Sequence, residues 1–184
     1  MKVVGILALQ GDFLEHSDAV EKLGFKAKEV KLPQDLEHID KLIIPGGEST
    51  TIGLLAEKYK LVGPLKKFIS SGRSVWGTCA GLIFLANHLE KLPIEVRRNA
   101  LGSQKNSFET YISAPDISDK PFRVLFIRPP RILKTRRKVE VLADYKFGNA
   151  VSPVAVKYKN ILATTFHSEL DADNPITKYF LLKF

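Results

Sequence analysis

The chain has 184 residues, 45% of them hydrophobic and 26% charged, which is typical of one soluble globular domain, here expected over residues 1–184. Its single cysteine excludes an internal disulfide and favours a reducing, cytoplasmic location, and no apolar stretch is long enough to span a membrane. The net charge of +8 comes without the interleaved aromatic residues or binding motif of nucleic-acid recognition, so we expect neither nucleic acid nor membrane as a partner.

The first half of the chain alternates predicted strands and helices. Buried-strand patterns occupy 2–9, 26–32, 40–47 and 73–77, and helical patterns occupy about 11–25, 50–59, 62–71 and 80–89. This alternation predicts a mainly parallel sheet with helices on both faces. The motifs PGGES (45–49) and GTCAG (77–81) both follow strands, so we expect them at the same edge of the sheet, where ligands bind in such folds.

From about residue 94 the pattern changes to short, often alternating segments split by Gly, Pro, Asn and Asp, which predict strands, some of them antiparallel. The basic stretch KTRRK (134–138) is interpreted as a solvated loop. A closing helix is expected over about 173–182, beginning at Asp173 or Asn174 with Pro175 in its first turn. The predicted fold class is α/β: a single-domain, three-layer fold with a mainly parallel central sheet flanked by helices and some antiparallel strands in the second half.

The single cysteine lies in a G-x-C-x-G pattern formed by Gly77, Cys79 and Gly81, which is the spacing of a nucleophile elbow. A sharp strand-to-helix turn would strain the backbone of Cys79 and expose its thiol above the sheet edge, and the glycines would avoid clashes. The helix N-terminus would favour the thiolate, and the N–H of Ala80 would point toward a developing oxyanion. From these residues alone, a nucleophile and a buried packing residue are equally supported.

An elbow of this kind requires a base, and the chain has four histidines. His16 is expected at or near the surface of the first helix, His38 lies in a polar connection, and His88 lies near the end of the elbow helix, directed away from the thiol. His167 follows a predicted strand, and Glu169 two residues later projects to the same side of an extended segment. The carboxylate would then hold Nδ1 of the ring so that Nε2 faces the sulfur.

The order of PGGES, GTCAG and a distant HSE resembles the triad-type, class I glutamine amidotransferases. More narrowly, the chain resembles the family of glutaminase subunits of pyridoxal 5'-phosphate synthases, over essentially its whole length. The segments that carry this likeness are LALQGDFLEH (7–16), PGGESTT (45–51), GTCAGLIFLA (77–86), RRN followed by SFE (97–109), FIRPP (126–130) and FHSEL (166–170).

This resemblance implies hydrolysis of L-glutamine to L-glutamate and ammonia through a thioester on Cys79, with His167 as general base and then acid, and Glu169 orienting it. It implies an oxyanion hole formed by the backbone N–H groups of Gly47 and Ala80. It implies no cofactor and no metal. The substrate-binding residues that it implies are Gly47, Glu48, Ser49, Arg98 (or the adjacent Arg97), Ile127 and Arg128.

The resemblance also implies a partner, a barrel-type synthase subunit that takes up the ammonia to make pyridoxal 5'-phosphate in vitamin B6 biosynthesis. We expect LALQGDF to form part of that contact, and docking to turn the Gly46–Gly47 peptide toward the oxyanion. Two departures from the family pattern are Ser168, where a proline is common, and GSQ (102–104), where GRQ is common. Two alternatives remain: the glutaminase of another amidotransferase, such as one of histidine or purine synthesis, and a catalytically silent regulatory subunit.

Overall fold

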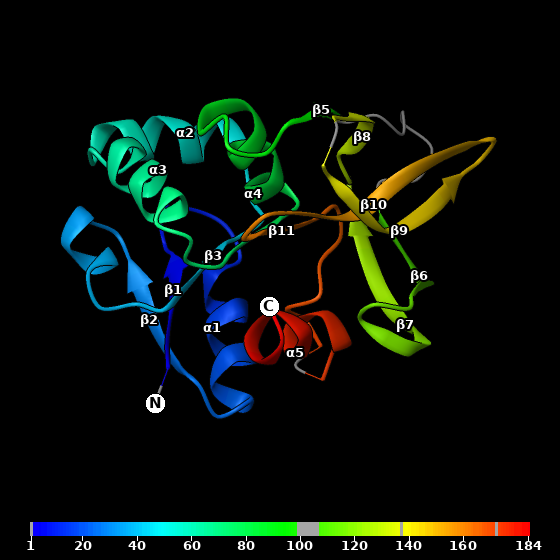
Figure 1. Cartoon of the computed structure of the whole chain (residues 1–184), viewed down its shortest axis with the longest axis horizontal. Helices are drawn as coiled ribbons and strands as arrows, with labels where there is room; N and C mark the ends of the chain where they lie inside the picture. The colour runs from blue at the N-terminus through cyan, green and yellow to red at the C-terminus, as the bar shows by residue number, and fades with distance from the viewer. Residues whose placement is uncertain (1, 99–106, 137, 172) are drawn as a thin grey trace.

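The structure is a computed structural model of the chain and describes residues 2–98, 107–136, 138–171 and 173–184 (Figure 1). The GSQ departure at 102–104 lies outside the described residues. No helix in these ranges is long and apolar enough to cross a membrane.

A seven-stranded sheet with the order β2-β1-β3-β4-β11-β10-β9 forms the centre of the fold. The first five strands in this order are parallel, and β10 is antiparallel to both of its neighbours. The prediction of a mainly parallel sheet with antiparallel strands in the second half is therefore confirmed. The strands are β1 (Val3–Leu7), β2 (Lys26–Val30), β3 (Lys41–Ile44), β4 (Val75–Thr78), β9 (Glu140–Phe147), β10 (Ala150–Tyr158) and β11 (Ile161–Thr164).

Helices cover both faces of this sheet, α2, α3 and α4 on one face and α1 and α5 on the other (Figure 1). Asn174 caps α5 as expected, because its side chain accepts a hydrogen bond from the N–H of Ile176 at 3.2 Å. The helices are α1 (Phe13–Lys22), α2 (Ser49–Lys58), α3 (Val62–Ser70), α4 (Ala80–Ile83) and α5 (Pro175–Leu182), with a short 3₁₀ turn at Pro33–Leu36.

The helix predicted over 80–89 is corrected, because α4 ends at Ile83 and the chain continues as a π-helical turn, Phe84–His88. In this wider turn the N–H of Leu89 donates to the carbonyl of Phe84 at 3.0 Å. Phe84 and the adjacent Leu85 are both fully buried there. The turn thus brings two consecutive large side chains into the core.

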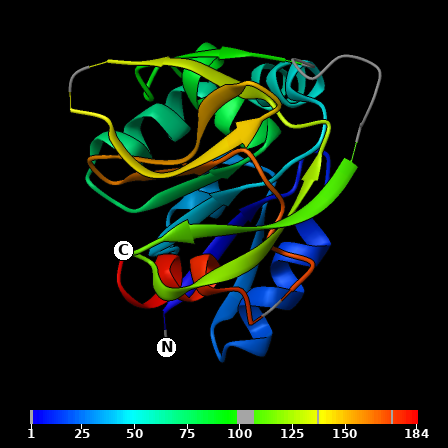
Figure 2. The ribbon, with the colours of Figure 1, turned by 90° about the vertical axis from the view of Figure 1, so that its right-hand side faces the viewer.

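Two small antiparallel sheets pack beside the central one, and Figure 2 shows the hairpin formed by β6 (Ser107–Ala114) and β7 (Ser118–Ile127). The other pair joins β5 (Ile94–Arg97) to β8 (Arg131–Thr135), with Glu95 opposite Lys134. The interpretation of KTRRK as a loop is therefore wrong at Lys134 and Thr135, which end β8. The side chain of Lys134 is exposed, so a basic residue is compatible with this strand.

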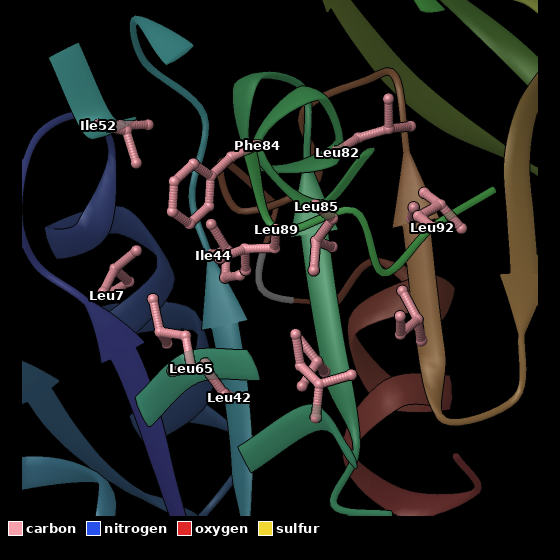
Figure 3. Close-up of a cluster of buried hydrophobic side chains, with 14 of the residues drawn as sticks. Leu7, Leu42, Ile44, Ile52, Leu65, Leu82, Phe84, Leu85, Leu89 and Leu92 are labelled. Carbon is pink, nitrogen blue, oxygen red and sulfur yellow. The ribbon is translucent and has the colours of Figure 1, made fainter. Parts of the chain in front are cut away.

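The core lies in two clusters, one on each face of the sheet. In the first, Leu7, Leu42 and Ile44 of the strands meet apolar side chains of α2, α3, α4 and the π-helical turn (Figure 3). In the second, Trp76 packs toward α1 and α5, with its ring centroid 5.5 Å from that of Phe180. Burial on both faces fixes the parallel strands, so the segments that follow β1, β3, β4 and β11 meet at one edge.

Candidate active site

Cys79 occupies a strained turn between β4 and α4. Its backbone angles are φ 47° and ψ −102°, in the region that L-residues rarely adopt, and its N–H donates to the carbonyl of Thr164 at 2.8 Å. The predicted elbow conformation is therefore present. The thiol is more covered than predicted, since Cys79 is only 8% exposed, and it faces a cavity instead of open solvent.

The two glycines of the elbow leave room for other parts of the chain. A Cβ atom at Gly81 would lie 2.0 Å from the carbonyl oxygen of Ile44, and one at Gly77 would lie 2.5 Å from Leu85. The backbone of α4 therefore contacts the end of β3 directly. This contact brings the elbow and PGGES together, as their positions after neighbouring strands predicted.

His167 and Glu169 form the predicted imidazole–carboxylate pair. Nδ1 of His167 lies 2.5 Å from Oε1 of Glu169, and the N–H of Ser168 donates to Oε2 of Glu169 at 2.8 Å. A backbone hydrogen bond from His167 to the carbonyl of Leu125, 2.8 Å long, fixes the segment against β7. The ring and its carboxylate are both buried, which keeps competing water away from the pair.

Burial and neighbouring groups determine the protonation states of His167 and Glu169. Burial alone would lower the pKa of His167, but hydrogen bonds with Asp12, Cys79 and Glu169 outweigh burial and raise that pKa to about 12. Burial would raise the pKa of Glu169, but the hydrogen bond to His167 and the charge of that ring hold it below its usual range. The structure thus brings the sulfur, the imidazole and the carboxylate together, and favours a charged ring.

Asp12 is a member of this cluster that the sequence analysis did not identify as a site residue. Its Oδ2 lies 2.9 Å from Nδ1 of His167, and burial raises the pKa of the Asp12 carboxyl although the bond to His167 opposes that shift. The available signal was its place in LALQGDF, the segment after β1, which reaches the same sheet edge as the other motifs. From the sequence alone, LALQGDF is expected only at the contact with the partner and not in the site.

His16 is buried, and the prediction that it lies near the surface is wrong. Its Nε2 lies 3.1 Å from Oγ1 of Thr78 and 3.6 Å from Oε2 of Glu169, and its ring meets Trp76 edge-on. Burial lowers its pKa, which favours the neutral ring. The reason is helical spacing: residues 16, 19 and 20 form the face of α1 that packs on the sheet.

Replacing His16 with alanine is expected to lower the free energy of unfolding by about 1–3 kcal/mol, because the change removes a buried hydrogen bond and leaves a void beneath Glu169. Denaturant unfolding of the variant and the wild type measures this difference. The matched control is His38→Ala, at an exposed position, which should change stability by less than about 0.5 kcal/mol. Equal stability of the two variants would contradict the packing role of His16.

A cavity of about 490 Å³ opens at this edge of the sheet. This volume falls in the range of roughly 300–1,000 Å³ that is typical of small-molecule sites. Arg98 lines it, which favours Arg98 over the adjacent Arg97 of β5. All of the predicted site residues line this cavity: Gly47, Glu48, Ser49, Cys79, Ala80, Arg98, Ile127, Arg128, His167 and Glu169.

On the cavity wall Glu48 caps α2 and pairs with Arg98. The carboxylate of Glu48 accepts hydrogen bonds from the N–H groups of Thr50 and Thr51, at 3.1 and 2.7 Å, and these bonds lower its pKa to about 2. Arg98 donates to Oε1 of Glu48 at 2.5 Å and to the hydroxyl of Thr50 at 2.8 Å. The two predicted substrate-binding charges therefore neutralise each other in this state.

The PGGES loop lies against the ring of His167 and against Gln10. A Cβ atom at Gly46 would lie 2.7 Å from Cε1 of His167, and Gly47 has φ +137°, which favours glycine. The side-chain oxygen of Gln10 accepts a hydrogen bond from the N–H of Glu48 at 2.7 Å. These contacts hold the loop in its present conformation beside Cys79 and His167.

Asp12, His167 and Glu169 also place one potential metal-ligand atom each within 4.8 Å of one another. The hydrogen bonds of both carboxylates with the imidazole account for this cluster. We therefore assign it to hydrogen bonding and not to metal coordination.

Known proteins similar to this chain include subunits of pyridoxal 5'-phosphate synthases and a glutamine amidotransferase. The pyridoxal 5'-phosphate synthase subunit PdxT of Thermotoga sp. (strain RQ2) is 45% identical over 97% of each chain, and that of Roseiflexus sp. (strain RS-1) is 44% identical over 97% of this chain and 98% of its own. A crystal structure of a glutamine amidotransferase covers 97% of this chain and 96% of its own, with a TM-score of 0.87 and 41% identity.

A more distant structure, PurLQS from Thermotoga maritima, has a TM-score of 0.72 at 17% identity over 91% of this chain and 87% of its own, and shares the fold alone. The family model described as the SNO glutamine amidotransferase family matches residues 6–184. The chain therefore belongs to the SNO glutamine amidotransferase family.

Proposed function

We propose that this chain is the glutaminase subunit of a pyridoxal 5'-phosphate synthase, and that it hydrolyses L-glutamine to L-glutamate and ammonia. The observation that carries the proposal is the convergence of Cys79, His167 and Glu169 on one cavity. The names of its relatives at 44–45% identity support the same assignment. The enzyme acts in the cytoplasm, consistent with its single free cysteine.

In this mechanism the thiolate of Cys79 attacks the side-chain carbonyl carbon of glutamine, and a C–S bond forms as the carbonyl oxygen takes up negative charge. The N–H groups of Gly47 and Ala80 stabilise that oxyanion. His167 gives its proton to the departing nitrogen, which leaves as ammonia and generates a thioester. His167 then removes a proton from water, whose oxygen displaces the sulfur, and glutamate is released.

The cavity wall supplies groups suited to free glutamine, which carries an α-carboxylate and an α-ammonium. Arg98 and Arg128 offer guanidinium donors for the carboxylate, and Glu48 offers a carboxylate for the ammonium. Ser49 and the backbone at Ile127 complete the substrate contacts. Binding of glutamine would then replace the ion pair between Arg98 and Glu48 with two contacts to substrate.

The two alternatives are less well supported. The likeness to the purine-synthesis protein PurLQS is 17% in sequence and shows the fold alone. A silent regulatory subunit has no need of a strained cysteine on the same cavity as a buried imidazole–carboxylate pair, and this chain has Cys79, His167 and Glu169 there. Labelling of Cys79 by an electrophilic glutamine analogue, blocked by glutamine, would exclude the silent subunit.

The ammonia requires a partner, because in water at neutral pH it is mostly protonated and non-nucleophilic. A barrel-type synthase subunit receives it directly, and the LALQGDF segment forms part of the contact. Docking turns the Gly46–Gly47 peptide so that its N–H faces the oxyanion, a change that two glycines permit at low cost. The hydrogen bond from the N–H of Glu48 to the side-chain oxygen of Gln10 holds the loop until then.

Glutamate release by the isolated chain is therefore expected to be slow, and addition of the synthase subunit is expected to raise kcat by at least about tenfold, because one oxyanion donor is worth a factor of about 10²–10³. Glutamate is measured by a coupled dehydrogenase assay at saturating glutamine. Equal rates with and without the synthase would contradict activation by docking. No glutamate under either condition would contradict the proposed function itself.

A further inference from the structure

Two carboxylates meet at a single ring nitrogen in this site. Oε1 of Glu169 lies 2.5 Å from Nδ1 of His167, and Oδ2 of Asp12 lies 2.9 Å from the same atom. A catalytic triad needs only one of these carboxylates to orient the ring. The contact made by Asp12 therefore calls for its own explanation.

Resting on the proposed function, we infer that Asp12 is a positioning residue: it shares the Nδ1–H of His167 with Glu169 and stabilises the imidazolium that pairs with the Cys79 thiolate. The second negative charge keeps the ring protonated while the sulfur remains ionised. Asp12 thereby raises the population of the reactive ion pair at neutral and mildly acidic pH.

The position of Asp12 in the fold supports this role. Asp12 is the N-cap residue of α1, where an aspartate normally accepts hydrogen bonds from the first N–H groups of the helix. Its side chain makes no such capping bond. The carboxylate instead contacts His167, so α1 lacks this capping hydrogen bond and the site gains a second carboxylate.

The opposite wall of the cavity also leaves space for this contact. A Cβ atom at Gly46 would lie 2.8 Å from Oδ2 of Asp12 and 2.7 Å from Cε1 of His167. Any residue other than glycine at position 46 would press on both partners. The PGGES loop thus leaves room for the Asp12–His167 pair.

The charges around the ring agree with the inference. Asp12 from the segment after β1, Glu169 from its own segment and Cys79 from the elbow face the ring. The buried His16 of α1 lies behind Glu169, with its Nε2 3.6 Å from Oε2 of that carboxylate. Burial disfavours the imidazolium, and among the contacts that oppose burial the hydrogen bond with Asp12 is the largest. Removing that carboxylate leaves Glu169 as the remaining carboxylate at Nδ1 of the charged ring.

The test is the rate at which iodoacetamide alkylates the chain, which reports on Cys79 alone because the chain has no other cysteine. Asp12→Asn is expected to slow alkylation about tenfold at roughly pH 6.5, since loss of one opposite charge beside the ring disfavours the imidazolium–thiolate pair by the equivalent of at least about one pKa unit. Asp18→Asn, the same change at an exposed position of α1, should match the wild type.

A second variant separates charge from folding. Asp12→Ser removes the carboxylate but supplies a good N-cap for α1, so it should retain the wild-type melting temperature and still show the slowed alkylation. If the alkylation profiles of both variants superimpose on that of the wild type, the inference is overturned. Alkylation needs no glutamine, so the two proposals can fail independently. A wild type without glutaminase activity would overturn the proposed function, whereas the alkylation rates would still test the role of Asp12.

Discussion

Replacing Cys79 with alanine is expected to reduce glutamate release by at least about 10³-fold when the synthase subunit is present, because loss of the nucleophile removes the thioester route entirely. Positioning and oxyanion stabilisation alone provide only a small residual rate. The measurement is the initial rate of glutamate formation at saturating glutamine, with wild type and variant at equal concentration.

The fold should tolerate this change. Alanine retains the Cβ atom at the strained backbone position and removes only the sulfur that faces the cavity. We therefore expect thermal unfolding of Cys79→Ala close to that of the wild type, so that lost activity reports chemistry. A variant that folds normally and still releases glutamate at more than about a tenth of the wild-type rate would contradict the assignment of Cys79 as the nucleophile.

The largest expected effect on stability comes from Gly81→Ala. The new Cβ would lie 2.0 Å from the carbonyl oxygen of Ile44, and neither backbone can move without separating α4 from β3. We expect a loss of about 3 kcal/mol or more in the free energy of unfolding, at the upper end of overpacking effects. Denaturant unfolding of the purified variant measures it, and poor soluble expression is expected as well.

Gly63→Ala is the matched control for this prediction. Gly63 lies in α3, and a Cβ atom there would meet no atom within 4 Å. The same methyl group should therefore leave stability unchanged or raise it by up to about 1 kcal/mol. Similar unfolding midpoints for the two variants would show that the contact between the elbow and β3 is not as tight as the structure indicates.

The first half of the fold was predictable because the signals for its strands and helices lie within a few residues of one another in the sequence. Apolar runs bounded by glycines marked β1, β3 and β4, and helical spacing marked α1, α2 and α3. Two of the elements that were not predicted depend on tertiary contacts. β8 begins with the charged Arg131 and has β5 as its strand partner, and the π-helical turn continues the apolar pattern of α4 without a break in the sequence.

The candidate site shows the same division. Cys79 and His167 were identified because glycine spacing and the H-x-E pattern lie within a few residues along the chain. The roles of Asp12 and His16 depend on contacts with residues far away in sequence, such as Glu169. His16 also looked polar and therefore exposed, yet its spacing with Ala19 and Val20 places it on the buried face of α1.

The adjacency of β4 and β11 limits how the distance between Cys79 and His167 can change in evolution. These two strands run side by side, and the N–H of Cys79 donates to the carbonyl of Thr164. One interstrand repeat, roughly 4.8 Å, therefore sets the separation of the segments that carry sulfur and ring. Cavity residues that come from outside these two strands, such as Arg128, can therefore change without altering that repeat, so selectivity for substrate can change while the hydrolytic chemistry is retained.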